Sequence, residues 1–266
     1  MQVETNSIFL PARDHPPSTL RRLADGVLNL LYPESCLVCS SPVSRMQDCG
    51  VCQPCWKNVL ALRISRPWCP SCGVPFQSAA IESGCLCGEC TLRMPKYAGA
   101  RSFGYYRGEL SRLVQGLKFE NRRNLVGLLS PLLAQTFMNS WEREEIDMVV
   151  PVPLHPKRRR ERGFNQAVLL ARGLIRLIGL PLSEAALVRA RNTPPQVGLT
   201  DAERRHNVRQ AFRCDRMGLV AHKRLLLVDD VMTTGATVCS ASEALLDAGA
   251  RRVSVLTVAR AVPGLE

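Results

Sequence analysis

The chain has 266 residues, of which 46% are hydrophobic and 5% aromatic, so it can bury one sizeable core and carry a small accessory module. It contains no apolar run of the roughly 20 residues that span a bilayer, and its start lacks the charged and apolar segments of an export signal. We therefore expect a cytoplasmic protein with no membrane span. The formal net charge of +12 favours anionic partners, a class that includes phosphate esters, nucleic acid and acidic membrane surfaces.

The first 30 residues show a helical pattern only in their second half. Residues 1–18 mix Pro, Asn, Asp and Ser without a stable period, which is typical of a leader without regular structure. Residues 19–31 then place leucine and valine at helical spacing, so that one face could pack on a neighbour. We predict a leader and a helix in residues 1–30, and membrane contact is the alternative for that helix.

Cysteines dominate the next segment. Ten of the twelve cysteines lie between Cys36 and Cys90, and no export signal precedes them, so metal binding is favoured over disulfides. A C-x-x-C pair places two thiolates at a bite that suits a tetrahedral ion, and two pairs complete a closed site. Twelve residues separate the first C-x-x-C pair from the second, and fourteen separate the third from the fourth. This similar spacing indicates an internal repeat. We predict a double zinc-ribbon module over residues 31–95 with two Zn²⁺ ions, one on Cys36, Cys39, Cys52 and Cys55 and the other on Cys69, Cys72, Cys87 and Cys90.

Further cysteines leave alternatives open. Cys49 and Cys85 could each replace a neighbouring ligand, and the C-x-x-C pairs could be cross-braced. A redox role is the main alternative for these pairs. Four thiolates leave no open coordination position, so the predicted sites are structural rather than catalytic. Cys214 and Cys239 have no evident histidine partner and are interpreted as buried thiols.

Residues 96–266 show the alternation of strands and helices of an α/β domain. Near-continuous apolar strands, such as LLLV at 225–228 and VSVLTV at 253–258, are typical of parallel strands buried on both faces. The pattern predicts a parallel sheet flanked by helices, with its ligand site at the carboxyl ends of the strands. The predicted strands are 97–106, 148–154, 224–231 and 253–259, and the predicted helices are 109–118, 124–138, 165–178 and 237–247.

The segment 225–237, LLLVDDVMTTGAT, carries the clearest functional pattern. An apolar strand ends in Asp229 and Asp230, and a turn of small residues leads into a helix whose N-terminus carries partial positive charge. Two carboxylates beside a phosphate would repel it unless they bound sugar hydroxyls or a cation, and a ribose 5-phosphate meets both demands. An acidic strand end with an ordinary threonine N-cap is the alternative. We predict that the phosphate lies against Thr233, Thr234, Gly235, Ala236 and Thr237.

A basic segment follows the predicted strand at 148–154. Five of the six residues from Lys157 to Arg162 are basic, and residues 151–224 together hold 16 Lys and Arg against 5 Asp and Glu. We predict a loop whose cations, with Lys157, Arg158 and Arg162 as candidates, stabilise a diphosphate leaving group as its negative charge grows. Magnesium usually shares this task. A solvated charge run is the alternative, since not all five cations can reach one ligand.

Residues 225–237 resemble the phosphoribosyl-diphosphate signature of type I phosphoribosyltransferases. The wider pattern is similar to the ComF/GntX family: it includes PVPLHPKRRRERGFNQ at 151–166, Arg189-x-Arg191-x-Thr193, and the YYRGEL and GLKF stretches. The resemblance implies a type I phosphoribosyltransferase-like fold in which a catalytic pair, Asp229 and Asp230, holds the ribose 2- and 3-hydroxyls of phosphoribosyl diphosphate in the presence of Mg²⁺. It also implies a mobile hood at 189–212 that brings Arg189, Arg191 and Arg204 close to the anion.

The same resemblance implies a role in DNA uptake during natural transformation or in the use of DNA as a nutrient. Three functions are compatible with the residues. The first is phosphoribosyl transfer to an acceptor, and the second is a sensor that binds the phosphoribosyl ligand without chemistry. The third is a DNA-handling factor whose basic residues in 151–224 hold single-stranded DNA beside a helicase-like or DNA-processing partner.

Overall fold

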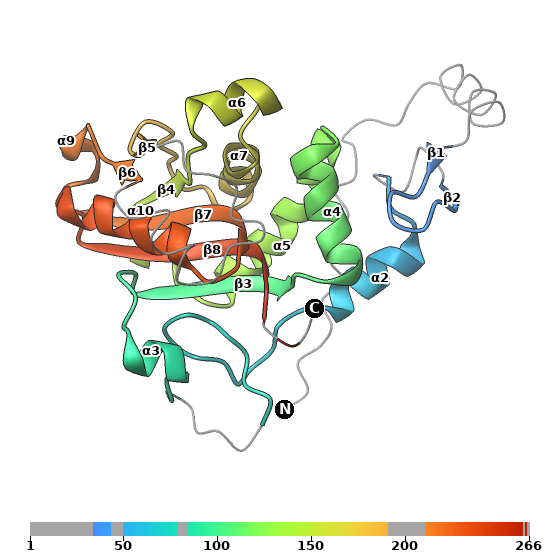
Figure 1. Ribbon diagram of the computed structural model, residues 1–266, viewed down its shortest axis with the longest axis horizontal. Helices are drawn as coiled ribbons and strands as arrows, with labels where there is room; N and C mark the ends of the chain where they lie inside the picture. Colours follow the sequence, from blue (N-terminus) through green and yellow to red (C-terminus); the bar gives the residue numbers. More distant parts are fainter. Residues whose placement is uncertain (1–33, 44–49, 79–83, 191–210, 263, 265–266) are drawn as a thin grey trace.

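The computed structural model describes residues 34–43, 50–78, 84–190, 211–262 and 264, and within them a four-stranded parallel sheet forms the centre of the molecule (Figure 1). Neighbouring strands pair in parallel. The predicted α/β fold with a parallel sheet is therefore confirmed, and the carboxyl ends of the strands share one edge. In spatial order the strands are β3 (Gly99–Tyr105), β8 (Arg252–Arg260), β7 (Arg224–Met232) and β4 (Met148–Pro151).

Helices cover both faces of this sheet. One face carries α4 (Gly108–Phe119), α5 (Val126–Met138) and α7 (Gln166–Ile178), and the other carries α10 (Ala236–Asp247). Leu226 and Val228 of β7 point to the first face, whereas Leu225 and Leu227, which alternate with them, point to the second. Both sets are fully buried. This double burial explains why residues 225–228 are all apolar.

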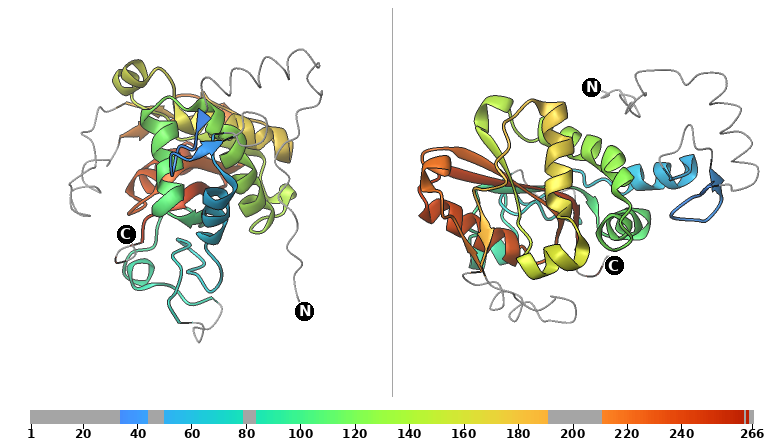
Figure 2. Two further views of the ribbon diagram at one scale, coloured as in Figure 1. Left: turned by 90° about the vertical axis from the view of Figure 1, so that its right-hand side faces the viewer. Right: turned by 90° about the horizontal axis from the view of Figure 1, so that it is seen from above.

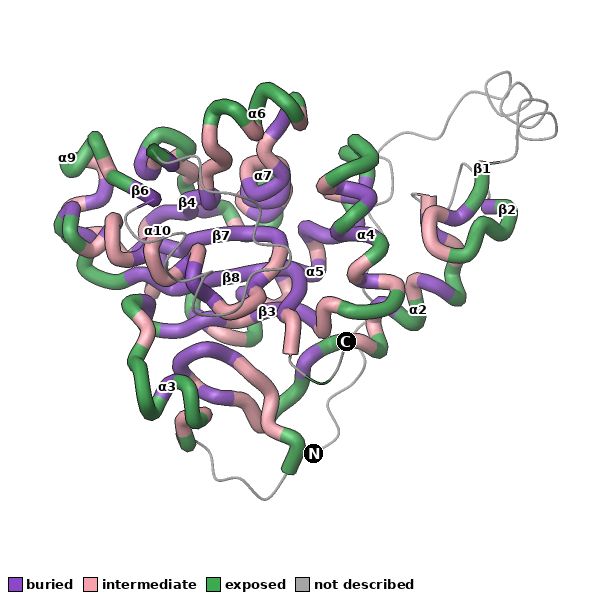
Figure 3. The backbone as a smooth tube through the Cα atoms, in the orientation of Figure 1, coloured by how far each residue is buried: buried purple, intermediate pink, exposed green. Residues whose placement is uncertain are grey.

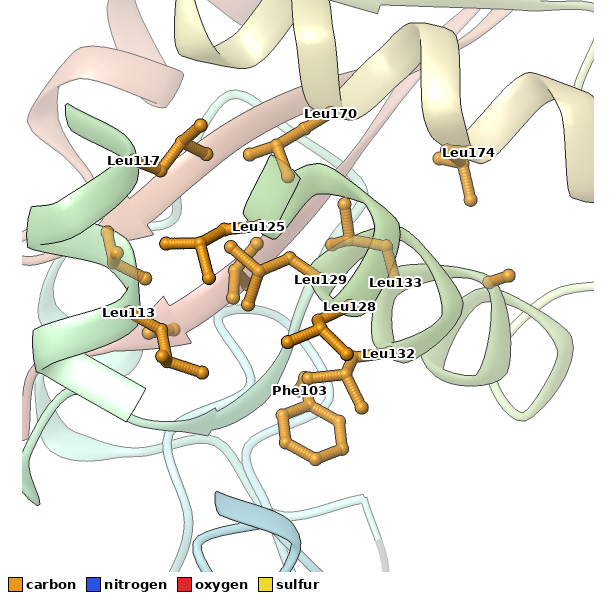
Figure 4. Close-up of a cluster of buried hydrophobic side chains, with 14 of the residues drawn as sticks. Phe103, Leu113, Leu117, Leu125, Leu128, Leu129, Leu132, Leu133, Leu170 and Leu174 are labelled. Carbon is orange, nitrogen blue, oxygen red and sulfur yellow. The ribbon is translucent and has the colours of Figure 1, made fainter. Parts of the chain in front are cut away.

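Leucines fill the space between the first face and its helices. Figure 4 shows Leu129 and Leu133 of α5, Leu170 and Leu174 of α7, and Phe103 of β3 in one cluster. Each of these side chains is at most 1% exposed. Fully burying such a side chain contributes roughly 1.5–3 kcal/mol. The central strands are buried along most of their length (Figure 3), so this core fixes the strand ends that carry the candidate site.

The basic segment after β4 is a short helix rather than the predicted loop. This helix, α6, spans Pro156–Arg162. Proline opens it, His155 Nδ1 accepts a hydrogen bond from the backbone N–H of Lys157 at 3.3 Å, and Gly163, with a φ of 79°, ends it. Lysine and arginine are also good helix formers. These signals outweigh the repulsion among the like charges.

Short elements complete the described chain. In the sheet domain they are η1 (Arg123–Leu125), η2 (Arg143–Glu145), α9 (Met217–Val220), and β5 (Val188–Arg189), which pairs antiparallel with β6 (Phe212–Arg213). In the cysteine-rich segment they are β1 (Glu34–Ser35), β2 (Pro42–Val43), α2 (Gln53–Ala61) and α3 (Gly88–Leu92).

The cysteine-rich segment packs directly on the sheet domain. Helix α2 lies against α4 (Figure 2). Past α2, the chain follows the outer edge of β3, the end strand of the sheet. The backbone N–H of Ile64 donates to the carbonyl of Phe103, and that of Tyr105 donates to the carbonyl of Leu62, both at 2.9 Å. These bonds cover backbone groups that an end strand otherwise exposes.

Two predictions fall outside the described residues. They are the leader and helix of residues 1–30 and most of the hood, including Arg191 and Arg204. In the part of the chain that the structure describes, no helix combines the length and the apolar character required to cross a membrane.

Candidate functional site

The turn between β7 and α10 has the geometry of an anion-binding loop. Gly235 adopts a left-handed backbone with a φ of 77° at the N-cap of α10, a conformation that glycine reaches without strain. The backbone N–H of Ala236 lies 3.4 Å from Thr234 Oγ1. Thr233 and Thr237 are half-buried beside it. The N–H groups at the start of a helix have no partners within the helix and attract phosphate, so the structure brings the five predicted turn residues together around such a position.

Asp229 and Asp230 lie near the end of β7, directly before this turn. Only 9% of Asp229 and 3% of Asp230 is exposed. Oδ1 of Asp229 accepts a hydrogen bond from the backbone N–H of Asp230 at 2.9 Å, and Oδ1 of Asp230 accepts one from the backbone N–H of Val231 at 2.7 Å. Burial, followed by the charge of Asp230, raises the pKa of Asp229 to about 7. Asp229 can therefore exchange a proton near neutrality, and its carboxylate accepts hydrogen bonds when ionised.

Lys118 of α4 joins the acidic pair, and the sequence analysis did not single it out. Its Nζ atom lies 3.1 Å from Oδ2 and 3.3 Å from Oδ1 of Asp230. The Lys118 side chain is 25% exposed and that of Asp230 4%, so solvent screens this ion pair only weakly. Burial disfavours the charged ammonium, but the carboxylates of Asp230 and Asp229 outweigh burial and raise the pKa of Lys118.

Only some of the basic side chains of α6 lie on the side of the acidic pair. Arg158 and Arg162 are half-buried and one helical turn apart, which places them on one face. Burial lowers the pKa of Arg162 and the charge of Asp230 raises it, so this guanidinium lies within electrostatic reach of the pair. The remaining cations of α6 are exposed, namely Lys157, Arg159 and Arg160.

Arg162 is held in place by two contacts. Its Nη1 atom donates a hydrogen bond to Gln166 Oε1 at 2.7 Å. Its guanidinium also lies over the ring of Phe119, 5.3 Å from the centroid. Phe119 follows Lys118 directly and is 70% exposed. The end of α4 thus supplies one cation to the acidic pair and one aromatic surface to the basic helix.

Arg189 lies on the Asp229 side of the site. It is 7% exposed, and its guanidinium stacks 5.3 Å from the ring centroid of Phe212. Burial, followed by the charge of Arg158, lowers the pKa of Arg189, whereas Asp229 raises it. The structure therefore brings Asp229, Asp230, Arg158, Arg162 and Arg189 together, and it adds Lys118 to them.

The eight predicted zinc ligands gather in two groups of four. Within each group the sulfur atoms lie within 4.8 Å of one another. The Cys39–Cys52 and Cys72–Cys87 sulfurs are each 3.6 Å apart. Four sulfurs at about 2.3 Å from a tetrahedral zinc ion would be separated by about 3.8 Å, so both sets fit the ion. We call Cys36, Cys39, Cys52 and Cys55 the first cysteine group, and Cys69, Cys72, Cys87 and Cys90 the second.

Consecutive C-x-x-C pairs therefore share a group and are not cross-braced. Backbone amides support the sulfurs: the N–H of Cys52 points at Cys36 Sγ over 3.4 Å, and that of Cys87 points at Cys69 Sγ over 3.5 Å. Cys85 is exposed and belongs to neither group, while Cys49 lies outside the described residues. Cys214 and Cys239 are half-buried rather than buried.

Comparison with known proteins accounts for the presence of two cysteine groups and a parallel α/β sheet in one chain. The profile described as a double zinc ribbon domain matches residues 27–94, and that described as a phosphoribosyl transferase domain matches residues 131–262. The DNA utilization protein YhgH of Escherichia coli (strain K12) is 32% identical over 234 residues, which cover 87% of this chain and 99% of YhgH. This chain belongs to the ComF/GntX family. A second ComF/GntX relative, competence protein F of Haemophilus influenzae, is 32% identical over 216 residues, or 80% of this chain and 91% of the relative.

Among solved structures, the glutamine phosphoribosylpyrophosphate amidotransferase from B. subtilis complexed with ADP and GMP matches 48% of the ComF/GntX chain and 25% of its own chain, at 26% identity and a TM-score of 0.33. The two profile matches and the parallel sheet show that the ComF/GntX chain combines a double zinc ribbon with a phosphoribosyltransferase-like α/β domain.

Proposed function

We propose that this ComF/GntX protein binds phosphoribosyl diphosphate with Mg²⁺ at the carboxyl edge of its sheet. One observation carries the proposal: a buried acidic pair runs directly into a glycine turn, with cations from α4, α6 and β5 around it. The ligand has a phosphate at one end, a diphosphate at the other and hydroxyls between them. The turn, the cations and the carboxylates are the three kinds of partner that these groups require.

Each part of the ligand then has assigned residues. Asp229 and Asp230 would accept hydrogen bonds from the ribose 2- and 3-hydroxyls, with Lys118 holding the Asp230 carboxylate in position. The turn from Thr233 to Thr237 would hold the 5-phosphate. Arg158, Arg162 and Arg189 would hold the diphosphate, with Lys157 and Arg191 as further candidates.

The donor set also fits Mg²⁺, which prefers carboxylate and phosphate oxygens. Asp229 is the better candidate, because Asp230 is already paired with Lys118. Burial leaves Asp229 with a raised pKa, and a cation beside it would stabilise the ionised form. When bound, the ion would neutralise charge on the diphosphate.

Phosphoribosyl transfer would form a bond from an acceptor nucleophile to ribose C1 and break the bond from C1 to the diphosphate oxygen. The diphosphate leaves with the electron pair of that bond, and Arg158 and Arg162 would stabilise it. A sensor that binds the ligand without transfer would use the same contacts. Release of diphosphate in the presence of an acceptor separates these two functions.

We further propose that the two cysteine groups hold structural Zn²⁺ and that the protein acts in DNA uptake or DNA utilisation. The fit of the sulfur spacings to a tetrahedral ion supports zinc. The relatives' names, DNA utilization protein and competence protein F, support the cellular role.

Calorimetric titration of phosphoribosyl diphosphate and Mg²⁺ into the zinc-loaded protein tests the ligand site. The intact protein should bind, and the double variant Asp229→Ala, Asp230→Ala should not. Asp247→Ala, at the far end of α10 and exposed, is the matched control and should bind normally. Absence of binding to the intact protein, or unchanged binding to the double variant, would refute the proposal.

Single-stranded DNA is a second candidate ligand, favoured by the exposed face of α6 and the neighbouring Phe119. Lys157, Arg159 and Arg160 are exposed, and Phe119 offers a base-stacking surface that is 70% exposed. Stacking on an aromatic ring contributes roughly 1–3 kcal/mol per base, and phosphate contacts weaken as salt rises. Phe119→Ala should therefore weaken binding of an oligothymidine, and binding should fall steeply with salt. A salt-independent affinity would rule out this candidate. A helicase-like or DNA-processing partner would act on the same strand.

A further inference from the structure

The second cysteine group lies directly behind the turn that we assign to the phosphate. Cys69, Cys72 and Cys90 belong to the same buried cluster as Met232 and Ala236, the residues that flank the turn. The first cysteine group is placed differently, because Cys36 and Cys55 belong to the cluster that α4, α5 and α7 form on the opposite face of the sheet. The two groups therefore pack on opposite faces of the sheet, and the first serves as an internal reference for the second.

Arg260, the last residue of β8, connects the second group to β7. It is 7% exposed. Its Nη1 atom donates to the carbonyl oxygen of Cys72 at 2.7 Å and lies 3.1 Å from Met232 Sδ, while Nη2 lies 3.6 Å from Cys72 Sγ. Arg260 pairs with Met232 in the register of the sheet as well. One guanidinium thus contacts both a predicted zinc ligand and the residue that precedes the turn.

The charge of Arg260 requires a partner, because a buried cation is costly unless it is balanced. Among the described residues, no carboxylate lies within ion-pair distance of Arg260. A zinc ion with four thiolates carries a net charge of about −2. Among the described residues, the second cysteine group with zinc bound is therefore the negative charge that can balance the Arg260 guanidinium.

Met232 lies between Arg260 and the turn. Its Cε atom lies 2.8 Å from the place where a Cβ on Gly235 would stand. The hydroxyl of Tyr97 lies 3.4 Å from the same point, and the carbonyl of Met232 accepts a hydrogen bond from the N–H of Ala261 at 2.9 Å. Met232 thus packs against the turn at Gly235, and Arg260 contacts the sulfur atom of Met232.

We propose that Arg260 is a positioning residue that couples zinc occupancy of the second cysteine group to the shape of the phosphate turn. Loss of zinc removes the counter-charge, so the guanidinium leaves Cys72 and shifts Met232 under Gly235. By linkage, a ligand that stabilises the turn must also stabilise zinc in the second group, and it leaves the first group unaffected. The inference rests on the proposed function for the zinc in the second group and for the identity of that ligand.

The first experiment needs no ligand. The full-length protein is loaded with zinc, and transfer of zinc to the dye 4-(2-pyridylazo)resorcinol is followed over time, which should give two phases. Arg260→Met, similar in size but uncharged, should accelerate one phase by about tenfold, within the usual range of coupling between sites. Arg252→Met, at the other end of β8 and 45% exposed, is the matched control and should change neither phase. Wild-type rates in both phases of Arg260→Met would overturn the proposal.

A second variant assigns the phases. Cys39→Ala removes one sulfur from the first group, so the zinc that remains belongs to the second group. The phase that survives in Cys39→Ala must be the phase that Arg260→Met accelerates, and the opposite assignment would overturn the proposal. If Arg260→Met does not fold, Arg260→Lys replaces it. Lysine keeps the charge but cannot contact Cys72 and Met232 together, so an intermediate acceleration of the same phase is expected.

The third experiment adds ribose 5-phosphate as the probe. At saturation it should slow the second group's phase by about tenfold, leave the other phase unchanged, and lose this effect in Met232→Ala. Ribose 5-phosphate that binds in calorimetry but slows both phases or neither would overturn the coupling. If ribose 5-phosphate does not bind at all, the proposed function fails, whereas the ligand-free comparison of Arg260→Met with wild type still decides the role of Arg260.

Discussion

Replacing Lys118 by methionine should make the stability of the protein depend on pH in a range where the wild type does not. In the folded wild type the pKa of Asp229 is about 7, raised by burial and by Asp230, and Lys118 limits that rise. Without the ammonium 3.1 Å from Asp230, the pKa of Asp229 should move above 7. The folded variant then keeps a proton that the unfolded chain, with an aspartate pKa of about 3.9, has already lost.

The sign and the size follow from proton linkage. Where the folded state binds more protons than the unfolded state, stability falls as pH rises. For Asp229 this decline runs from about pH 4 to about pH 7 in the wild type and continues above pH 7 in Lys118→Met. One additional proton corresponds to about 1.4 kcal/mol per pH unit. Because the wild-type Asp229 is itself half protonated at pH 7, the stability difference between the two proteins should grow by up to about 1 kcal/mol between pH 7 and pH 8.

Urea unfolding of both proteins in matched zinc-containing buffers from pH 6 to 8.5 measures this difference. Lys118→Arg retains the positive charge and should follow the wild type. Lys96→Met, an exposed lysine, controls for loss of a surface charge. An equal stability loss for Lys118→Met at pH 6 and pH 8.5 would show that Lys118 is not the counter-charge of the acidic pair.

The remaining predictions concern the turn and the acidic pair. Gly235→Ala should lower the affinity for ribose 5-phosphate and destabilise the protein by about 1 kcal/mol or more, because alanine is strained at a φ of 77° and its Cβ would lie 2.8 Å from Met232 Cε. Calorimetry and urea unfolding measure both effects, and an unchanged affinity would show that the turn does not hold the phosphate. Affinity for ribose 5-phosphate should fall by up to tenfold per pH unit below about pH 7, because a protonated Asp229 cannot accept a second hydroxyl hydrogen bond as a carboxylate does. Asp229→Asn should remove that part of the pH profile and leave only the titration of the ligand phosphate near pH 6, so an identical profile in the variant would contradict the assignment.

Much of the sheet was predictable because its strands are buried on both faces. The alternating strand and helix patterns located β7, β8, α7 and α10 to within a few residues, since each is bounded by turn residues or charged ends. Helix α6 was missed because five cations in six positions suggest a solvated loop. Pro156 and Gly163, at its two ends, were the signals that could have identified it.

The candidate site was predictable where its residues are adjacent in sequence and was not where they come from distant segments. The acidic pair and the turn lie within nine residues of one strand and helix junction. Lys118 lies 112 positions from Asp230, and on its own helix it resembles any other lysine in the last turn. Arg260 directly follows the predicted strand 253–259, and its burial is explained by its packing against the second cysteine group.

The contact between the cysteine-rich segment and β3 has a consequence for expression of shortened chains. Residues 62–64 bond to the outer edge of β3 through Leu62 and Ile64, and the N–H of Ala100 donates to the carbonyl of Ser71 at 2.7 Å. A chain that begins after Cys90, the last residue of the second cysteine group, would lack these partners on the outer side of the seven-residue strand β3. Such an open edge recruits strands from other molecules and leads to aggregation. Backbone groups of the cysteine-rich segment thus cover the outer edge of the sheet, and we expect a shortened chain without this segment to aggregate more than the full chain.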